Sequence, residues 1–205
     1  RPALCEDALR LGRILAGVAP GEPEVHGLVA LMEIQASRTR ARTGPGGEPV
    51  RLLEQNRALW DGILIARGLA ALALAEKLGG AKGPYALQAG IAACHARARR
   101  AEDTDWRRIV ELYAELARVA PSPVVELNRA VAVAMADGPA AGLALLEPLS
   151  REPALRDYHL LPAVRGELLQ RLGRDEEARA QFARAASLTQ NAREREMLTR
   201  RAAGT

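Results

Sequence analysis

AVRGELLQRLGRDEEARAQFARAASLTQ, residues 163–190, has the apolar spacing of two helices. We expect them over Tyr158–Leu172 and Asp175–Leu188, joined by a turn at Gly173. Residues of small, large, turn, small, large and small type follow one another at Gly166, Leu169, Gly173, Ala178, Phe182 and Ala185. A small residue on each helix lets the two axes approach, and a large residue fills the neighbouring gap. The pattern predicts a closely packed helical hairpin.

The same order of residue sizes occurs upstream. Ala130, Gly142 and Leu146 precede Gly166, Ala178 and Phe182 by 36 positions. This spacing is near the period of tetratricopeptide repeats, which is roughly 34 residues. We therefore expect an all-α protein built as an array of antiparallel helix pairs, with a right-handed, tetratricopeptide-like solenoid in its C-terminal half.

The composition also favours helices over sheets. Of 205 residues, 48% are hydrophobic and only 3% aromatic, and β-branched residues are sparse. This argues against Rossmann, barrel and sandwich enzymes. The size suits one continuous helical domain, in which we separate an N-terminal helical part, residues 1–100, with a mobile loop at 38–50, from the repeats of residues 101–205.

Further helices follow from apolar spacing and turn residues. A first helix carries Leu4, Ala8, Leu11 and Leu15, and a second places Val25, Leu28, Leu31 and Met32 inward. A long helix is expected from about Leu52 to Leu78, with a bend near Asp61-Gly62. Thr104 is expected to cap the helix that carries Trp106.

Charge and cysteine content point to a soluble cytoplasmic protein. The net charge of +4 is small, and its arginine clusters fit a solvated face better than a nucleic-acid site, because no aromatics interleave with them. Cys5 and Cys94 form no paired motif, and we expect both to be buried and reduced. No apolar stretch reaches the roughly 18 residues of a membrane span, so we expect no membrane contact.

No catalytic or metal-binding motif is recognisable. His26, His95 and His159 are far apart in sequence and none lies in an H-E-x-x-H motif. Side chains of Cys94 and His95, adjacent on one expected helix, point about 100° apart and do not suit a shared metal. We therefore predict no enzyme activity, no cofactor, no metal and no catalytic residue.

Residues 48–61, EPVRLLEQNRALWD, carry the most informative pattern outside the repeats. On a helix, Glu54, Arg57 and Asp61 would form a polar stripe beside an apolar stripe of Leu53 and Trp60. Tryptophan and arginine often dominate protein interfaces, so the segment suits docking onto a partner. The same spacing equally fits an internal anchor with Trp60 in the core and Arg57 between two acids.

Blocks along essentially the whole chain resemble one family: LCEDALRLGRILA, PEVHGLVALMEIQASRTRAR, LLEQNRALWDGILIARG, GPYALQAGIAACHA, DTDWRRIVELYAEL, PSPVVELNRAVAVA, GLALLEPL and YHLLPAVRGELLQRLGRDEEA. They look like the C-terminal extension of extracytoplasmic-function RNA polymerase sigma factors, in the subgroup with a tetratricopeptide-like tail. The family's signature falls on Glu54, Gln55, Arg57, Trp60 and Asp61, with Asn56 where an acid is common.

The resemblance implies a regulatory, non-enzymatic role. In the family two helical domains that bind promoter DNA and polymerase precede the extension, and Arg1 would lie just after them. The implied partners are the sigma core domains of the same protein and RNA polymerase, with promoter DNA contacted only through the missing domains. The alternative is a free-standing tetratricopeptide-like scaffold for peptide binding or oligomerisation.

Overall fold

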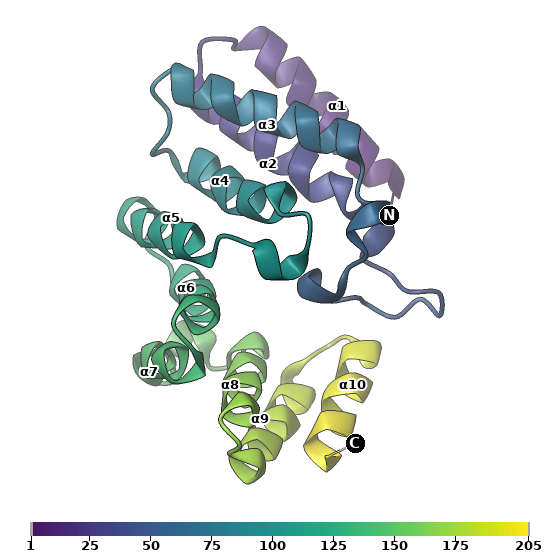
Figure 1. Cartoon of the computed structure of the whole chain (residues 1–205), viewed down its shortest axis with the longest axis vertical. Coiled ribbons are helices and arrows are strands. Elements are labelled where there is room, and N and C mark those ends of the chain that lie inside the picture. Colours follow the sequence, from purple (N-terminus) through teal and green to yellow (C-terminus); the bar gives the residue numbers. More distant parts are fainter. Residues whose placement is uncertain (1, 205) are drawn as a thin grey trace. The chain divides into compact units, whose positions relative to one another are not determined.

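A computed structural model describes residues 2–204, with side chains from Leu4 onward; Arg1, where the resemblance places the preceding boundary, lies outside them. Within these residues the chain forms ten α-helices and five short 3-10 turns, with no β-strand (Figure 1). The fold is therefore an all-α array. It divides into two compact units, residues 1–120 and 121–205, so the boundary falls after residue 120 rather than after residue 100.

The first unit contains α1 (Pro2–Val18), α2 (Pro23–Ser37), α3 (Gly62–Lys77), α4 (Pro84–Arg97) and α5 (Trp106–Val119). Helix α2 is central, because it packs against α1, α3 and α4, while α5 packs against α4. The contact between α4 and α5 explains why the unit extends beyond residue 100.

The central position of α2 also changes which of its residues are buried. Val25, Leu28, Leu31 and Met32, expected to face inward, are only half-buried. The fully buried positions include Val29, Ala30, Glu33 and Ile34 instead. A helix covered on three sides buries more than one stripe, so its buried positions extend beyond the single predicted face.

Glycines let the neighbours of α2 come close. A Cβ built on Gly68 of α3 would lie 2.6 Å from Cγ1 of Ile34 and 3.0 Å from the carbonyl oxygen of Ala30. A Cβ on Gly27 would lie 2.7 Å from the backbone nitrogen of Ala86 on α4. Both contacts are too short for any larger residue, so these two glycines set the helix spacing.

Helix α1 is attached to α2 by an apolar contact and a salt bridge. Leu9 is buried, Gly12 abuts Met32, and the guanidinium of Arg13 holds the buried carboxylate of Glu33 at 2.7 and 3.1 Å. A carboxylate that is 1% exposed needs such a partner, because an unpaired buried charge is strongly destabilising. The salt bridge therefore fixes the face that α1 turns towards α2.

The prediction of one long helix from Leu52 to Leu78 is wrong, although the bend expected near Asp61-Gly62 coincides with the start of α3. Two 3-10 turns, Leu52–Glu54 and Arg57–Leu59, occupy its first part, and α3 begins only at Gly62. The preceding segment, expected to be mobile, is closed by hydrogen bonds from Val50 N to Arg42 O and from Gly44 N to Glu48 O, each 2.9 Å.

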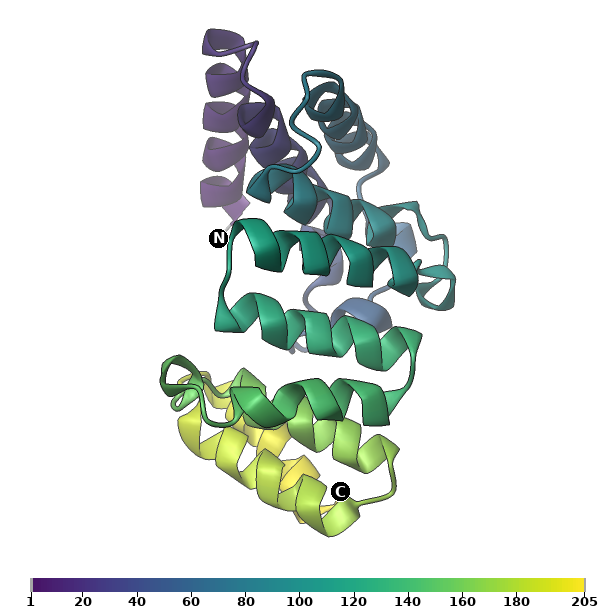
Figure 2. The same ribbon diagram turned by 90° about the vertical axis from the view of Figure 1, so that its left-hand side faces the viewer.

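The second unit consists of α6 (Pro123–Ala136), α7 (Pro139–Leu149), α8 (Leu160–Arg171), α9 (Asp175–Leu188) and α10 (Ala192–Ala203). Helices α6 and α7 form one pair and α8 and α9 a second, with α10 packed on α9 (Figure 2). A Cβ on Gly142 of α7 would lie 2.7 Å from the carbonyl oxygen of Ala130 on α6. The 36-residue echo in sequence therefore falls on two helix pairs.

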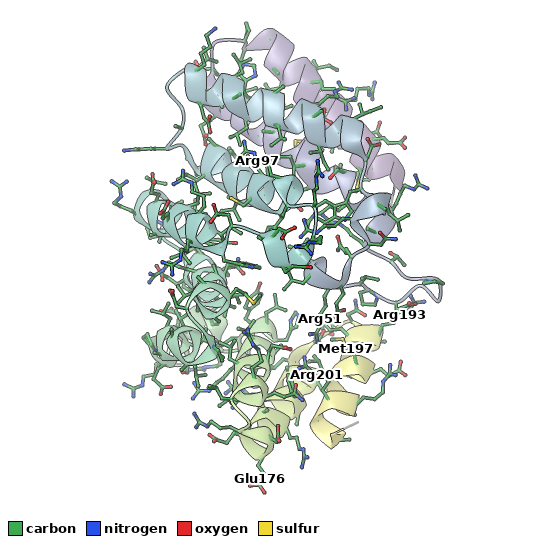
Figure 3. The ribbon with its side chains drawn as sticks, viewed as in Figure 1. Arg51, Arg97, Glu176, Arg193, Met197 and Arg201 are labelled. Carbon is green, nitrogen blue, oxygen red and sulfur yellow. The ribbon has the colours of Figure 1, made fainter. Side chains whose placement is uncertain are left out.

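In the pair α8–α9, four of the six repeat residues share one buried cluster: Leu169, Ala178, Phe182 and Ala185. Gly166 faces the ring of Phe182, because its Cβ would come within 2.7 Å of that ring. Gly173 has φ +72°, the left-handed conformation that a helix-ending glycine adopts without strain. Arg201 is carried by α10 (Figure 3). Its guanidinium lies 4.0 Å from the centroid of the Phe182 ring.

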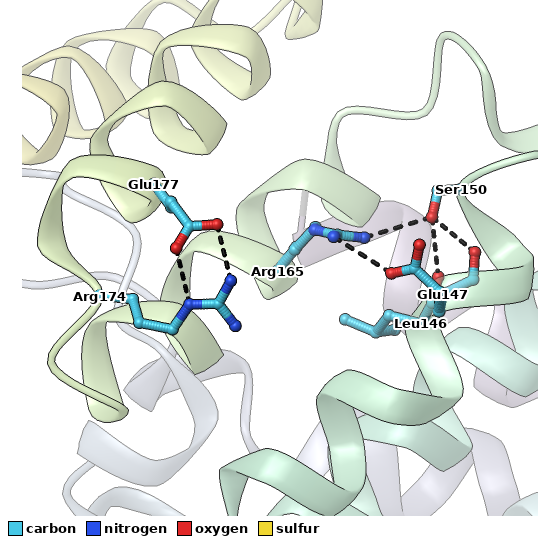
Figure 4. A network of polar contacts seen from close by, with 6 residues as sticks. All are labelled: Leu146, Glu147, Ser150, Arg165, Arg174 and Glu177. Atoms are coloured by element: carbon cyan, nitrogen blue, oxygen red, sulfur yellow. Dashed lines mark hydrogen bonds and ion pairs between the residues drawn. The ribbon is translucent and has the colours of Figure 1, made fainter.

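Surface arginines join neighbouring helices of this unit. Arg165 of α8 reaches the end of α7, with contacts of 3.2 Å to both Glu147 and the Ser150 hydroxyl (Figure 4). Arg174 and Glu177 pair at the start of α9.

Among the described residues, no helix is both long and apolar enough to cross a membrane.

Candidate functional site

The five residues of the expected docking segment do not share one surface. Glu54 and Asp61 are exposed, Arg57 is half-buried, and Gln55 and Trp60 are buried. Because the segment is not a continuous helix, the polar stripe of Glu54, Arg57 and Asp61 does not form.

Local hydrogen bonds explain why the segment is not helical. The side chain of Asn56 accepts from Ala58 N at 3.0 Å, and that of Asp61 accepts from Ile63 N and Leu64 N at 2.9 and 3.1 Å. Asp61 therefore caps α3, and its own backbone N–H donates to the carbonyl of Ser37 at 2.9 Å. Asparagine and aspartate favour such caps over helix interiors, so they divide the segment into short turns.

Trp60 lies inside the first unit with two arginines against its ring. Its side chain is 8% exposed, and the guanidiniums of Arg57 and Arg38 lie 4.7 and 5.8 Å from the indole centroid. Both distances fall in the range of cation–π attraction. The indole therefore acts as a platform for two arginines that precede it in the chain.

Arg57 connects this platform to the end of α4. Its guanidinium donates to the carbonyl of His95, to that of Ala98 at 2.8 Å, and to the hydroxyl of Thr104 at 3.4 Å. The last carbonyls of a helix have no partner within the helix, and a cation there also interacts favourably with the helix dipole. Arg57 thus caps α4 from a segment that lies 38 residues earlier.

We call the five residues Arg38, Arg57, Trp60, His95 and Thr104 the arginine–tryptophan hub. The ring of His95 completes it, packing edge-on against Trp106 at a centroid distance of 5.2 Å. Arg38 also donates to the side chain of Gln35.

Burial and mutual repulsion alter the ionisation of the hub. Burial, followed by the charges of Arg38 and Arg57, lowers the pKa of His95 from 6.5 to about 4. Burial and the charges of Arg42 and Arg57 lower the pKa of Arg38 to about 10. Burial also lowers the pKa of Arg57, although Asp103 and Glu102 oppose this shift. At neutral pH the hub therefore holds two cations and one neutral imidazole.

Comparison with known proteins places part of the hub in a recognised sequence region. Residues 1–76 match the model of a family of unknown function, DUF6596. An uncharacterized protein of Rhizobium meliloti (strain 1021) is 49% identical over 191 residues, which are 93% of this chain and 44% of that relative. The chain thus spans less than half of the relative's length. No solved structure matches.

The region that matches DUF6596 does not contain the whole hub. It includes α1, α2 and nearly all of α3, with Arg38, Arg57 and Trp60. His95 and Thr104 lie beyond it, on α4 and just before α5. The hub therefore ties the DUF6596-matching residues to the rest of the first unit.

Sequence reasoning missed three members of the hub. Arg38 lies in the segment expected to be a mobile loop, and His95 carries no motif. Thr104 was expected to cap α5, but Asp105 does so, accepting from Arg108 N at 2.9 Å, which leaves Thr104 for Arg57. His95 and Thr104 lie 38 and 47 residues from Arg57, beyond the reach of any local pattern.

The two cysteines differ from one another. Cys94 is buried, and burial raises the pKa of its thiol above the usual value, whereas Cys5 on α1 is exposed, contrary to expectation. Cys5 borders a hollow of about 470 Å³ between α1 and the end of α2. The described residues contain no cluster of three or more metal-ligating side chains.

The neutral state of His95 predicts a pH-dependent stability. Between pH 4 and 6.5 the unfolded chain binds a proton at His95 that the folded chain does not, so stability falls as pH drops. From pH 7 to pH 5 this group alone is expected to lower the free energy of unfolding by about 2 kcal/mol. Urea unfolding at both pH values measures the loss, and His95→Gln should remove that part of it. Equal losses in both proteins would contradict the assignment.

Proposed function

We propose that this chain is the regulatory C-terminal domain of an extracytoplasmic-function sigma factor. It acts through contact with the sigma core domains of the same protein or with RNA polymerase, and it has no enzymatic activity. Promoter DNA is contacted only by the domains that precede it. The parent protein recognises promoters and starts transcription in the cytoplasm.

The observation that carries this proposal is the length of the relative. The matched residues make up 44% of it, so more than half of that relative lies outside the region that matches this chain. That length leaves room for two DNA-reading domains. The ordered blocks that resemble the sigma-factor extension support the same assignment.

The hub gives the signature residues a structural role within this proposal. Gln55 and Trp60 are buried and Arg57 is half-buried, so these three side chains hold the segment in place from inside. The side chains that the segment presents outward include Leu53, Glu54 and Leu59. A partner that reads this segment therefore contacts its exposed residues.

A binding titration tests the proposal. The two core domains that the proposal places before this chain are expressed separately and titrated with it by calorimetry. We expect a dissociation constant of about 10 µM or tighter, equivalent to about 7 kcal/mol. Absence of binding both to the core and to RNA polymerase would overturn the proposal and favour the peptide-binding or oligomerising scaffold.

A second experiment examines the segment itself. The pair Glu54→Lys and Leu59→Ser changes exposed side chains only, so folding should be retained. If the segment docks, transcription by the full-length protein should fall about fivefold or more. Lys82→Ala, in an exposed turn of the same unit, is the matched control. Unchanged transcription by a folded variant would exclude the segment as a contact.

A further inference from the structure

Helix α1 presents an apolar face to solvent. Its outward side carries the largest group of exposed apolar side chains on any one described helix: Leu4, Leu11, Ile14, Leu15 and Val18. Val18 is 78% exposed and Leu4 62%. Scattered exposed leucines are ordinary, but a contiguous apolar stripe on one helix is typical of an interaction surface.

The stripe is separate from the face that holds α1 in place. Leu9, Gly12 and Arg13 point towards α2, whereas Leu4, Leu11 and Leu15 recur at spacings of seven and four on the other side. Figures 1 and 2 show α1 at the edge of the first unit, beside α2. Helix α1 therefore has two apolar faces, of which the described structure covers one.

A hollow adjoins this stripe. Its apolar wall consists of Cys5, Ala8, Leu9 and Met32, and Gln35 and Arg42 form part of its polar edge. Ala8 belongs to both the stripe and the hollow, because it lies four residues after Leu4 and lines the hollow. A helix lying along the stripe can place one large side chain in the hollow, as helix-in-groove partners do.

We propose that the outward face of α1 docks an amphipathic helix of the sigma core, with one apolar side chain of that helix seated in the Cys5–Met32 hollow. This inference rests on the proposed function and names the surface through which it acts. Its occupant belongs to the polypeptide outside this chain, because the relative carries more than half of its length beyond the matched region.

The charges beside the stripe favour a protein partner. Glu6, Asp7 and Arg10 lie beside it, so bases do not exceed acids there, and Arg13 is paired with Glu33 on the face towards α2. An interfacial membrane helix needs an excess of lysine or arginine on its polar face, and a nucleic-acid surface needs uncompensated cations. The flanks of α1 offer neither.

The test compares two sets of exposed apolar side chains. Leu11→Ser with Val18→Ser removes part of the stripe, and Ile63→Ser removes a side chain of α3 that is 71% exposed. In the titration with the sigma core, the double variant should bind about tenfold more weakly or worse, because apolar anchors dominate such interfaces. Ile63→Ser should stay within about twofold of the parent chain.

Cys5 supplies an independent readout. It should react readily with a thiol reagent in the free chain and at least about tenfold more slowly in the complex, because the docked helix covers the hollow. Cys94, which is buried, is replaced by alanine only if it reacts on the same timescale. Unchanged Cys5 reactivity in a saturated complex would overturn the proposal.

The outcomes separate this inference from the proposed function. If the core binds the double variant as tightly as the parent chain, the α1 surface is wrong while the regulatory role stands. If the chain binds no core and no polymerase, the proposed function fails first. If the free chain is a dimer that the double variant dissociates, a second copy occupies the stripe and the inference is overturned.

Discussion

Trp60→Ala is expected to lower the free energy of unfolding of the first unit by about 4 kcal/mol. The indole is 8% exposed, and two guanidiniums pack on it at 4.7 and 5.8 Å. Removing it leaves a cavity and deprives Arg57 and Arg38 of their aromatic contact. Urea unfolding followed by fluorescence of Trp106, the remaining tryptophan and a residue of the same unit, measures the loss.

Trp60→Phe is the matched control for this variant. It keeps an aromatic ring beneath the arginines and removes an indole N–H that has no hydrogen-bond partner within the described chain. We expect a loss of about 1 to 1.5 kcal/mol, well below that of the alanine variant. If Trp60→Ala lowered the free energy by less than about 1 kcal/mol, the hub would not be a stabilising centre of the unit.

The expected loss of stability makes Trp60→Ala unsuitable as a test of docking by the signature segment. A loss of transcription in a Trp60→Ala protein would follow from unfolding of the first unit as readily as from a lost contact. Substitutions at Glu54 and Leu59, which are exposed, leave the hub intact. They report on docking without disturbing the platform, so the two roles of the segment can be separated.

Much of the helical array could be predicted from the sequence. Both ends of α9, Asp175 and Leu188, were predicted correctly, because three acids open this helix and the glycine at 173 ends the preceding one. The error at Leu52–Leu78 arose from apolar spacing alone, which continues through Asn56 and Asp61 although both residues favour caps. Reading those two residues as caps would have divided the segment correctly.

The candidate surfaces could be identified only from the tertiary structure. The spacing of Leu4, Leu11 and Leu15 identifies one face of a helix, but periodicity does not say whether anything covers it. Likewise Arg57 and Trp60 fit both docking and anchoring by spacing. The contacts of Arg57 with His95 and Thr104, from distant parts of the chain, and the burial of Trp60 are what place these two residues inside the unit.

Phe182→Ala is expected to lower the free energy of unfolding of the second unit by about 4 kcal/mol. The ring is 1% exposed, packs against Gly166, and lies under the guanidinium of Arg201. Both tryptophans belong to the first unit, so their fluorescence should be unaffected while the helical circular dichroism of the second unit is lost at lower urea. Simultaneous loss of both signals would show instead that the two units unfold together.

The contact between Gly166 and Phe182 can be examined by exchanging the sizes of the two residues. Gly166→Ala alone places a Cβ within 2.7 Å of the ring, and we expect a loss of about 1 to 3 kcal/mol from overpacking. Phe182→Leu alone leaves space beside Gly166 and should cost about 1 to 2 kcal/mol. In the double variant the smaller leucine accommodates the added methyl, so its loss should be smaller than the sum of the single losses by about 1 kcal/mol. Additive losses in urea unfolding would mean that these two residues do not determine the separation of α8 and α9.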